Sequence, residues 1–263
     1  MSDALLMERA GSVLTLHLNR PALHNAFDAE LIATLTAALD TAAQAAEIRA
    51  VVLAGHGVSF SAGADLQWMR AMASATEEEN RRDSLALARL MRTLDELPKP
   101  TIARVHGASF GGGVGLIACC DIAIASSDAR FGLTESRLGL LPAVISPYVI
   151  AAIGPRQARR YFTTGEHFDA ATALNIGLIH QMVVPAQLDE AVQRQLDLLG
   201  KAGPVAAASA KTLVRNVAAA SGERDRLDQA NAALIAALRA SPEGKEGLSA
   251  FLDKRPPRWA TQG

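Results

Sequence analysis

"GASFGGGVGLIACCD", residues 107–121, places five glycines, at positions 107, 111, 112, 113 and 115, directly ahead of an apolar run. A glycine inside a regular element costs about 0.5–1 kcal/mol relative to alanine, so this density indicates that the bare backbone is needed there. Three kinds of site need it: a phosphate cradle, a dinucleotide fingerprint, or a pair of amide donors aimed at a developing negative charge. The residues around the stretch discriminate among them.

Two of these three sites conflict with the neighbouring residues. A Walker-type loop requires Gly-Lys-Ser/Thr after its glycines, whereas Val114, Gly115 and Leu116 follow here, so no lysine can reach a phosphate. Residues 113–118 match the G-x-G-x-x-A dinucleotide pattern, but the segment before the strand expected near Asp121 is too short for the crossover helix of a βαβ unit. Two explanations of the glycines stay open. Either they present paired amide donors, or they only allow short helices to pack closely on strands.

Strand and helix patterns alternate along the chain on both sides of this stretch. Residues 12–21 alternate like a strand and precede helical spacing over 25–44, while the apolar run 48–55 precedes a Gly-bearing loop and a helix from Leu66. Phe60 and Phe110, 50 residues apart, occupy equivalent places in this pattern, which is a weak internal repeat. The pattern predicts an α/β fold built from stacked strand-and-helix turns.

The composition changes towards the carboxy terminus. Beyond Pro147 the chain is rich in Ala, Leu and Arg, and helical spacing predicts mainly helices. We therefore expect an α/β core over residues 1–200 and a helical region over residues 201–263. The helices are predicted over residues 158–164, 169–177, 186–202, 204–219 and 224–240.

Charge and hydropathy exclude two classes of partner. The 263 residues include 26 basic and 27 acidic side chains, and no run of basic residues forms a footprint for nucleic acid. The amino-terminal segment has no apolar signal region. The longest uncharged stretch, residues 138–154, is shorter than the ~20 residues of a membrane helix and contains Pro142 and Pro147. We expect a cytoplasmic protein that binds neither nucleic acid nor membrane.

Cysteine and histidine residues predict no metal site. Cys119 and Cys120 are adjacent in an apolar segment, where they can form neither a disulfide framework nor a site with metal-ligand spacing. We interpret them as core thiols in a reducing compartment. His56 and His106 adjoin glycines with no second imidazole at ligand spacing.

Two loops offer matching amide donors. If SAGAD (residues 61–65) and GGGVG (residues 111–115) each join a strand to a helix, their N–H groups lie at helix amino termini, which attract an anion. Small residues at the closest positions let a planar acyl group approach without a Cβ in the way. The pairing favours two amides that share one oxygen.

These loops, with two other segments, resemble a known family. FSAGADL (60–66), HGASFGGGVGLIACCDIAIASSDARFG (106–132), LHLNRPALHNAFD (16–28) and FLDKRPPRW (251–259) are similar to the enoyl-CoA hydratase/isomerase, or crotonase, superfamily, essentially over the whole chain. The resemblance implies a spiral of ββα repeats with a carboxy-terminal helical trimerisation region. It also implies homotrimers or dimers of trimers, and acyl-CoA thioester substrates with no separate cofactor.

The resemblance also implies site residues. The catalytic set would be the amides of Ala64 and Gly112 as the oxyanion hole and Glu135 as the acid/base. Glu135 alone, beside Thr134 and Ser136, would otherwise suit the first turn of a helix. The positions implied for substrate and coenzyme A are Leu23, His24, Ala62, Asp65, Leu66, Trp68, Gly111, Gly115, Pro142, Phe251 and Lys254.

One position departs from the usual hydratase pattern. Many hydratases hold the attacking water between two glutamates, and the second would stand at Gly115, which has no side chain. Three mechanisms then stay open: Glu135 alone adds water, a carboxylate of the substrate helps to position it, or the enzyme is a Δ3,Δ2-enoyl-CoA isomerase with one base. A non-catalytic scaffold or RNA-associated protein is the alternative from a different class.

The acyl group is predicted from a narrower resemblance. Residues 131–150 and GADLQWM (63–69) are similar to bacterial 3-methylglutaconyl-CoA hydratases. This implies hydration of a branched, carboxylated enoyl-CoA, as in leucine degradation. Arg137 is the nearest candidate in sequence to pair with the substrate carboxylate, and a surface ion pair is an equal alternative. Trp68 either lines the acyl pocket or fills the core.

Overall fold

Two β-sheets organise the chain, which the structure, a computed structural model, describes over residues 4–220, 222 and 224–261. The larger sheet has the strand order β1-β2-β3-β5-β7-β10 and the smaller one β4-β6-β8-β9. β1 pairs antiparallel with β2 and β9 with β8, while the other neighbours are parallel. The strands span Leu5–Ala10 (β1), Val13–Leu18 (β2), Ala50–Gly55 (β3), Ser59–Ser61 (β4), Thr101–Val105 (β5), Ala108–Phe110 (β6), Ile122–Ser126 (β7), Arg130–Gly132 (β8), His167–Asp169 (β9) and Gln181–Val183 (β10).

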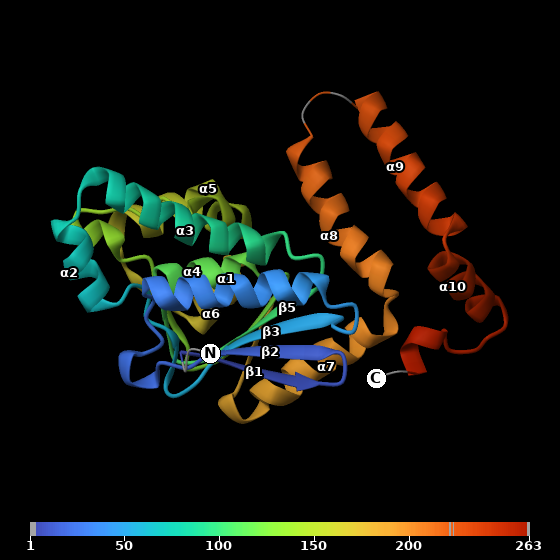
Figure 1. The fold of residues 1–263 in the computed structure, drawn as a ribbon, viewed down its shortest axis with the longest axis horizontal. Helices are drawn as coiled ribbons and strands as arrows, with labels where there is room; N and C mark the ends of the chain where they lie inside the picture. The colour runs from blue at the N-terminus through green and yellow to red at the C-terminus, as the bar shows by residue number, and fades with distance from the viewer. Residues whose placement is uncertain (1–3, 221, 223, 262–263) are drawn as a thin grey trace.

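Helices follow the strands and enclose the sheets (Figure 1). A short 3₁₀ helix, η2 (Glu135–Leu138), lies between β8 and α5, and another, η4 (Arg258–Thr261), lies near the carboxy terminus. The α-helices span Ala29–Gln44 (α1), Leu66–Ser74 (α2), Glu77–Asp95 (α3), Gly112–Cys119 (α4), Ser146–Thr164 (α5), Ala170–Asn175 (α6), Leu188–Lys201 (α7), Pro204–Ala219 (α8), Arg224–Ala240 (α9) and Pro242–Leu252 (α10).

The central strands of the larger sheet bury both faces, because alternate side chains point to opposite sides of a strand. Leu53 of β3 joins the main core, which includes Leu35 of α1 and Val114 of α4. Val52, one residue earlier, packs instead with Val192 of α7 on the other face. This two-sided burial explains the continuous apolar run of residues 48–55, which is typical of parallel strands.

The expected alternation of strands and helices, followed mainly by helices, is confirmed. The sequence pattern did not predict β1, β9, β10 or α10. α5 also begins earlier than the predicted helix over 158–164, because it consists of two helices that meet at Gly154, whose φ of 76° is not helical. Pro155 opens the second of these helices, and it interrupts the pattern that the sequence shows.

The carboxy-terminal helices extend away from the sheets (Figure 1). Lys211 of α8 binds the carboxylate of Asp121, at the start of β7, with Nζ to Oδ2 at 2.8 Å. The guanidinium of Arg49, before β3, donates to the carbonyls of Ala202 at 2.8 Å and Trp259 at 2.9 Å. Both ends of the 202–259 segment are thus attached to the sheet, while α8 and α9 project beyond it.

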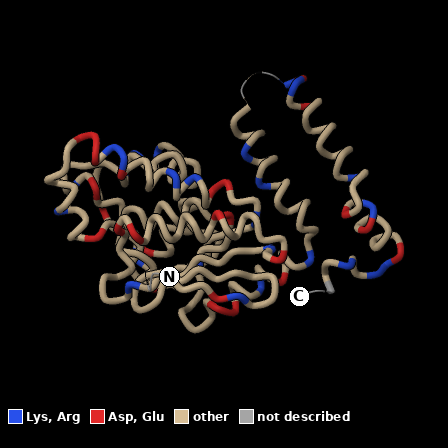
Figure 2. Tube along the Cα trace, viewed as in Figure 1, with Lys and Arg blue, Asp and Glu red and all other residues tan. Residues whose placement is uncertain are grey.

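Residues of both charge signs are interspersed along the chain (Figure 2), and their formal net charge is −1. Within the described residues, no helix combines the length and apolarity needed to cross a membrane.

Candidate active site

Two parallel neighbouring strands deliver the two glycine loops to one place. β4 precedes α2 and β6 precedes α4, and β4 pairs with β6 in the smaller sheet. Their loops touch: a Cβ placed on Gly63 would lie 2.9 Å from the carbonyl oxygen of Phe110 and 3.8 Å from Cα of Gly111. Gly63 has φ of +87°, so both the conformation and the close approach require glycine. The predicted convergence of the two loops is therefore present.

The amide of Ala64 faces away from the segment that supports it. Phe27 N–H donates to the Gly63 carbonyl at 2.6 Å, and Asp65 N–H donates to the Phe27 carbonyl at 2.8 Å. In this parallel bridge between Phe27 and Ala64, the N–H of Ala64 itself points to the opposite edge. Among the described residues, none accepts a hydrogen bond from that N–H.

The amide of Gly112 opens α4. Gly111 caps this helix with φ of 49° and donates its own N–H to the Gly132 carbonyl at 2.9 Å. The N–H of Gly112 has no acceptor within the described part of the chain, as expected of the first amides of a helix. A Cβ on Gly112 would lie 2.5 Å from the ring of Phe27, so the residue must be glycine.

Glu135 lies against the same loop. A Cβ on Gly111 would lie 3.1 Å from Oε1 of Glu135, and within the described residues the buried Oε2 has no hydrogen-bond partner. Burial raises the pKa of this carboxyl above its ordinary value, and a backbone hydrogen bond opposes the rise only in part. Glu135 is therefore a carboxylate with one unsatisfied oxygen beside the Gly111 turn, which suits it to exchange protons.

Gly115 does not face an open space, in contrast to the expectation that it contacts substrate. It is buried in α4, and a Cβ there would overlap Cγ2 of Ile145 and lie 2.9 Å from its Cβ and 3.3 Å from Cε of Met91. The volume where a second glutamate would stand is thus filled by apolar side chains. Close packing of α4 on the start of α5 is the physical reason for this glycine.

Five of the residues predicted to bind coenzyme A lie in the first glycine loop, in the segment before α1 or at the start of α2. The amides of Leu23, His24, Ala62 and Asp65 are engaged in hydrogen bonds within the chain. Contacts from these four residues to a ligand would therefore use carbonyls or side chains. Leu66, at the first position of α2, is 71% exposed, and this leaves it accessible.

Trp68 and Pro142 take different roles. Trp68 of α2 packs partly against the main core, and its Nε1 donates to Asp83 of α3 at 3.2 Å. Trp68 therefore connects α2 to α3 and contributes to the core, which was one of the two roles expected for it. Pro142 is buried in the segment that joins η2 to α5.

Arg137 lies near the Gly165 turn. Its Nε would be 3.2 Å from a Cβ on Gly165, and its charge contributes to the lowered pKa of Glu166 after the larger effect of the Arg160 hydrogen bond. Among the described residues, the Arg137 guanidinium forms an ion pair neither with Glu135 nor with any other carboxylate, so the alternative of a surface ion pair is not seen.

Phe251 and Lys254 are separated from the other predicted residues. Phe251 belongs to α10 and is 80% exposed. Figure 1 places α10 at the opposite end of the molecule from α2, which follows the first glycine loop. Within one chain, therefore, these two residues do not join the site.

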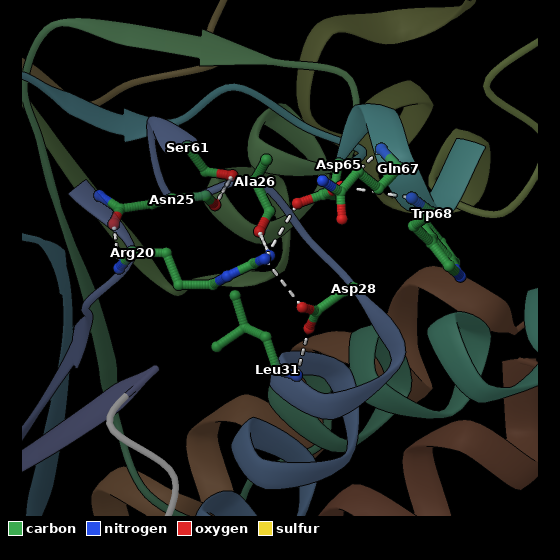
Figure 3. Close-up of polar contacts among 9 residues, drawn as sticks. All are labelled: Arg20, Asn25, Ala26, Asp28, Leu31, Ser61, Asp65, Gln67 and Trp68. Carbon is green, nitrogen blue, oxygen red and sulfur yellow. Dashed lines mark hydrogen bonds and ion pairs between the residues drawn. The ribbon is translucent and has the colours of Figure 1, made fainter. Parts of the chain in front are cut away.

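Two functional candidates were not identified from the sequence, although both lie in the LHLNRPALHNAFD segment. Asn25 is fully buried and donates from Nδ2 to the carbonyls of His56 at 2.9 Å and Ser59 at 2.8 Å. Arg20 reaches from the end of β2 to the first glycine loop (Figure 3). In the sequence, both are recognisable only as polar residues close to Pro21, one on each side of it.

The two cysteines lie in the core, as expected. Cys119 and Cys120 are buried free thiols. Burial raises the pKa of Cys120 to about 12, so this thiol is chemically inert near neutral pH. Within the described residues, no group of three or more His, Cys, Asp or Glu side chains could hold a metal ion.

Comparison with known proteins agrees with this geometry. The structure resembles that of an enoyl-CoA hydratase from Shewanella pealeana, with a TM-score of 0.93 and 44% identity over 97% of this chain and 96% of that one. It also resembles Pseudomonas aeruginosa AtuE, with a TM-score of 0.94 and 38% identity over 98% and 99%. The fold is thus the mixed α/β fold of crotonases.

Sequence comparison gives the family. A model of the "Enoyl-CoA hydratase/isomerase" family matches residues 8–262. The 2,3-dehydroadipyl-CoA hydratase of Escherichia coli is 33% identical over 255 residues, which cover 96% of this chain and 97% of the relative. The chain belongs to the enoyl-CoA hydratase/isomerase family and is an enzyme of the enoyl-CoA hydratase type.

Proposed function

We propose that this enzyme adds water across the Cα=Cβ bond of an enoyl-CoA thioester, with Glu135 as the acid/base and the amides of Ala64 and Gly112 as the oxyanion hole. The observation that carries the proposal is the unpartnered, buried Oε2 of Glu135 beside the Gly111 turn. One amide donor of this kind is worth about 2.7–4 kcal/mol of transition-state stabilisation. Two such donors account for much of the barrier reduction.

The proton balance needs only one carboxylate. Ionised Glu135 takes a proton from water as the oxygen bonds to Cβ. The electron pair of the Cα=Cβ bond then joins Cα to the thioester carbon, whose carbonyl pair moves onto the oxygen. The two amides stabilise the resulting enolate. Protonated Glu135 then delivers its proton to Cα, which restores the carboxylate. A pKa raised by burial favours both transfers.

For the substrate, we propose a branched, carboxylated enoyl-CoA such as 3-methylglutaconyl-CoA. The resemblance of residues 131–150 to that group of hydratases supports this. So does the name of the E. coli relative, since 2,3-dehydroadipyl-CoA also carries a free carboxylate at the end of its acyl chain. A substrate carboxylate would help to position the water where this chain has Gly115 packed by Ile145.

The test follows the loss of the conjugated thioester absorbance on 3-methylglutaconyl-CoA and on crotonyl-CoA. We expect a higher kcat/KM on the carboxylated substrate and loss of turnover in Glu135→Gln, by about 10²–10⁴-fold. The exposed Glu78→Gln variant is the matched control. Equal or faster turnover of crotonyl-CoA would contradict the carboxylate preference. Full activity of Glu135→Gln would contradict the catalytic assignment of this residue.

A Δ3,Δ2-enoyl-CoA isomerase is the second candidate, favoured by one observation. Ile145 and Met91 occupy the volume of a second carboxylate, and isomerisation needs a single base to move one proton. A 3-enoyl-CoA that gains conjugation without incorporating oxygen from ¹⁸O-labelled water would decide for the isomerase. Incorporation of the label at Cβ would decide for the hydratase.

We propose further that residues 201–263 assemble the protein into a homotrimer, or a dimer of trimers. The carboxy-terminal helices present exposed apolar side chains in a single chain, and α10 lies far from the first glycine loop. A neighbouring copy would then supply Phe251 and Lys254 to the coenzyme A site. The exposed side chains are Val205, Val214, Val217, Ile235, Leu248, Phe251 and Leu252.

A further inference from the structure

Arg20 connects the segment before α1 to the loop that carries Ala64. Its side chain is 17% exposed, and Nη1 donates to the Ala26 carbonyl at 2.6 Å. Nη2 lies 2.9 Å from Oδ2 of Asp65 and 2.9 Å from Oδ2 of Asp28. Figure 3 shows the guanidinium between the two carboxylates.

Both carboxylates also cap helices. Asp28 accepts from the N–H of Leu31 at 2.8 Å and so caps α1, while Asp65 accepts from Gln67 at 2.7 Å and from Trp68 at 3.2 Å and caps α2. An aspartate cap contributes about 0.5–2 kcal/mol to a helix. Because one nitrogen of Arg20 contacts both caps, the starts of α1 and α2 are held at a fixed separation.

The Arg20 guanidinium also supplies the counter-charge for the two neighbouring carboxylates of Asp28 and Asp65. Burial raises the pKa of Asp65, but the amides of Trp68 and Gln67, together with Arg20, outweigh that effect and lower it overall. Without Arg20, the ionised Asp65 and Asp28 would face one another without a counter-charge, with the Asp65 side chain only 8% exposed. Breaking a buried pair in this way leaves an uncompensated charge.

Ala64 lies between two kinds of attachment. On its amino-terminal side, Ser61 Oγ donates to the Asn25 carbonyl at 2.9 Å and accepts from Gly63 N–H at 3.3 Å. On its other side, Arg20 is the side chain that holds Asp65 among the described residues. Because the N–H of Asp65 also donates to the Phe27 carbonyl at 2.8 Å, a shift at Asp65 would disturb the bridge to Phe27 that orients the Ala64 amide.

We propose that Arg20 is a positioning residue for the oxyanion hole: by clamping Asp65 to Asp28 and the Ala26 carbonyl, it aims the Ala64 amide at the thioester oxygen. This inference rests on the proposed function of that amide. It predicts that loss of Arg20 weakens enolate stabilisation more than binding of the coenzyme A portion. A purely structural residue would lower stability without this selective effect.

The experiment titrates the purified full-length protein with acetoacetyl-CoA, whose bound enolate absorbs in the near ultraviolet and reports the oxyanion hole without turnover. We expect Arg20→Met to lower the bound enolate fraction strongly, and kcat by about 10–100-fold, part of the 10²–10³-fold that loss of a whole donor costs. KM should change less than about threefold. Arg89→Met, which removes the exposed pair with Asp40, is the matched control and should behave like wild type.

A second pair of variants tests the clamp itself. Arg20→Lys keeps the charge but not the fork, so we expect an intermediate enolate fraction. In Arg20→Met/Asp65→Asn the cap is retained without the unpaired charge, and part of the lost kcat should return.

The outcomes are distinguishable. If wild type binds acetoacetyl-CoA without forming the enolate, the proposed oxyanion hole is wrong. If wild type forms it and folded Arg20→Met forms it equally well, the positioning role is wrong. Should Arg20→Met fail to fold, Asp65→Asn provides the same measurement, and an undiminished enolate fraction there would overturn the inference.

Discussion

The pKa of Glu135 is raised and its Oε2 lacks a hydrogen-bond partner, both because the carboxylate is buried. The carboxylate lies beside Gly111, and its buried Oε2 has no hydrogen-bond partner among the described residues. Desolvation then favours the protonated form. The same geometry that exposes this residue to a substrate therefore makes it unfavourable for folding when ionised.

This predicts the pH dependence of both activity and stability. The acid limb of kcat/KM should lie above the pKa of an exposed glutamate, because the raised pKa of Glu135 requires higher pH for ionisation. The ionised carboxylate destabilises the fold above its folded pKa, and this effect disappears below its unfolded pKa. Glu135→Gln should thus have a higher Tm than wild type at neutral pH but not at acidic pH. A Tm difference independent of pH would contradict this.

Gly115 gives a second prediction at the same scale. Gly115→Ala should lower the free energy of unfolding by about 1–3 kcal/mol, because the new Cβ overlaps Ile145 in a packed core. Gly200→Ala is the control: it lies in α7 with nothing within 4 Å of its Cβ position, so it should be neutral or stabilising by up to about 1 kcal/mol. Urea unfolding measures both. Equal effects of the two variants would show that Ile145 moves freely.

The sequence could predict the residues that a short motif specifies, but not those defined by distant contacts. The two Gly-bearing loops were recognisable because each joins a strand to a helix and needs bare backbone. The occupant of the space beside Gly115 was not, since Ile145 is 30 residues away and reaches it only through the packing of α5 on α4. Arg20 was missed for the same reason, because Asp65 is its partner only in the fold.

At the scale of elements, α8 is attached to the sheet by a small polar cluster. Lys211 also donates to the Lys99 carbonyl at 3.1 Å, and Thr101 donates its N–H and hydroxyl to the same oxygen of Asp121 at 2.7 and 2.8 Å. Lys211 is only 11% exposed. The starts of β5, β7 and the middle of α8 therefore share one carboxylate.

Lys211→Met should lower the free energy of unfolding by about 1–3 kcal/mol, because it removes the counter-charge of the Asp121 carboxylate and the donor to the Lys99 carbonyl. Arg81→Met removes the exposed pair with Glu78 and should have no measurable effect. Chemical denaturation of both variants is the measurement. Identical unfolding midpoints for wild type and Lys211→Met would contradict the attachment.

Elements whose apolar residues repeat at a regular spacing were predicted from the sequence. Elements that are held mainly by contacts with other parts of the fold were missed. α1 and α7 bury an apolar stripe and were recognised from spacing. β1 was not, because five of its six residues are exposed and it is held by pairing with β2 at the sheet edge. α10 buries Ala250 alone among its residues, so its sequence has little apolar pattern.

At the scale of the molecule, the projecting helices predict an assembly. Phe251→Asp/Leu252→Asp should reduce the mass in solution from three or six times the 27.6 kDa chain towards that of one chain, since charges would replace side chains that are 80% and 75% exposed here. Leu198→Asp on α7, 57% exposed, is the control. Light scattering measures the mass, and a monomeric wild type would contradict the proposed assembly.

The packing of Ile145 against α4 also constrains how this enzyme can diverge. A glutamate introduced at position 115 has no room while Ile145 keeps its place, and a smaller residue at 145 opens a cavity while position 115 stays glycine. Gaining a second carboxylate therefore needs both substitutions, and whichever comes first, at position 115 or at position 145, gives a destabilised variant. The single-base chemistry proposed for this chain is therefore maintained by the close packing of two helices, and not only by the absence of a side chain at position 115.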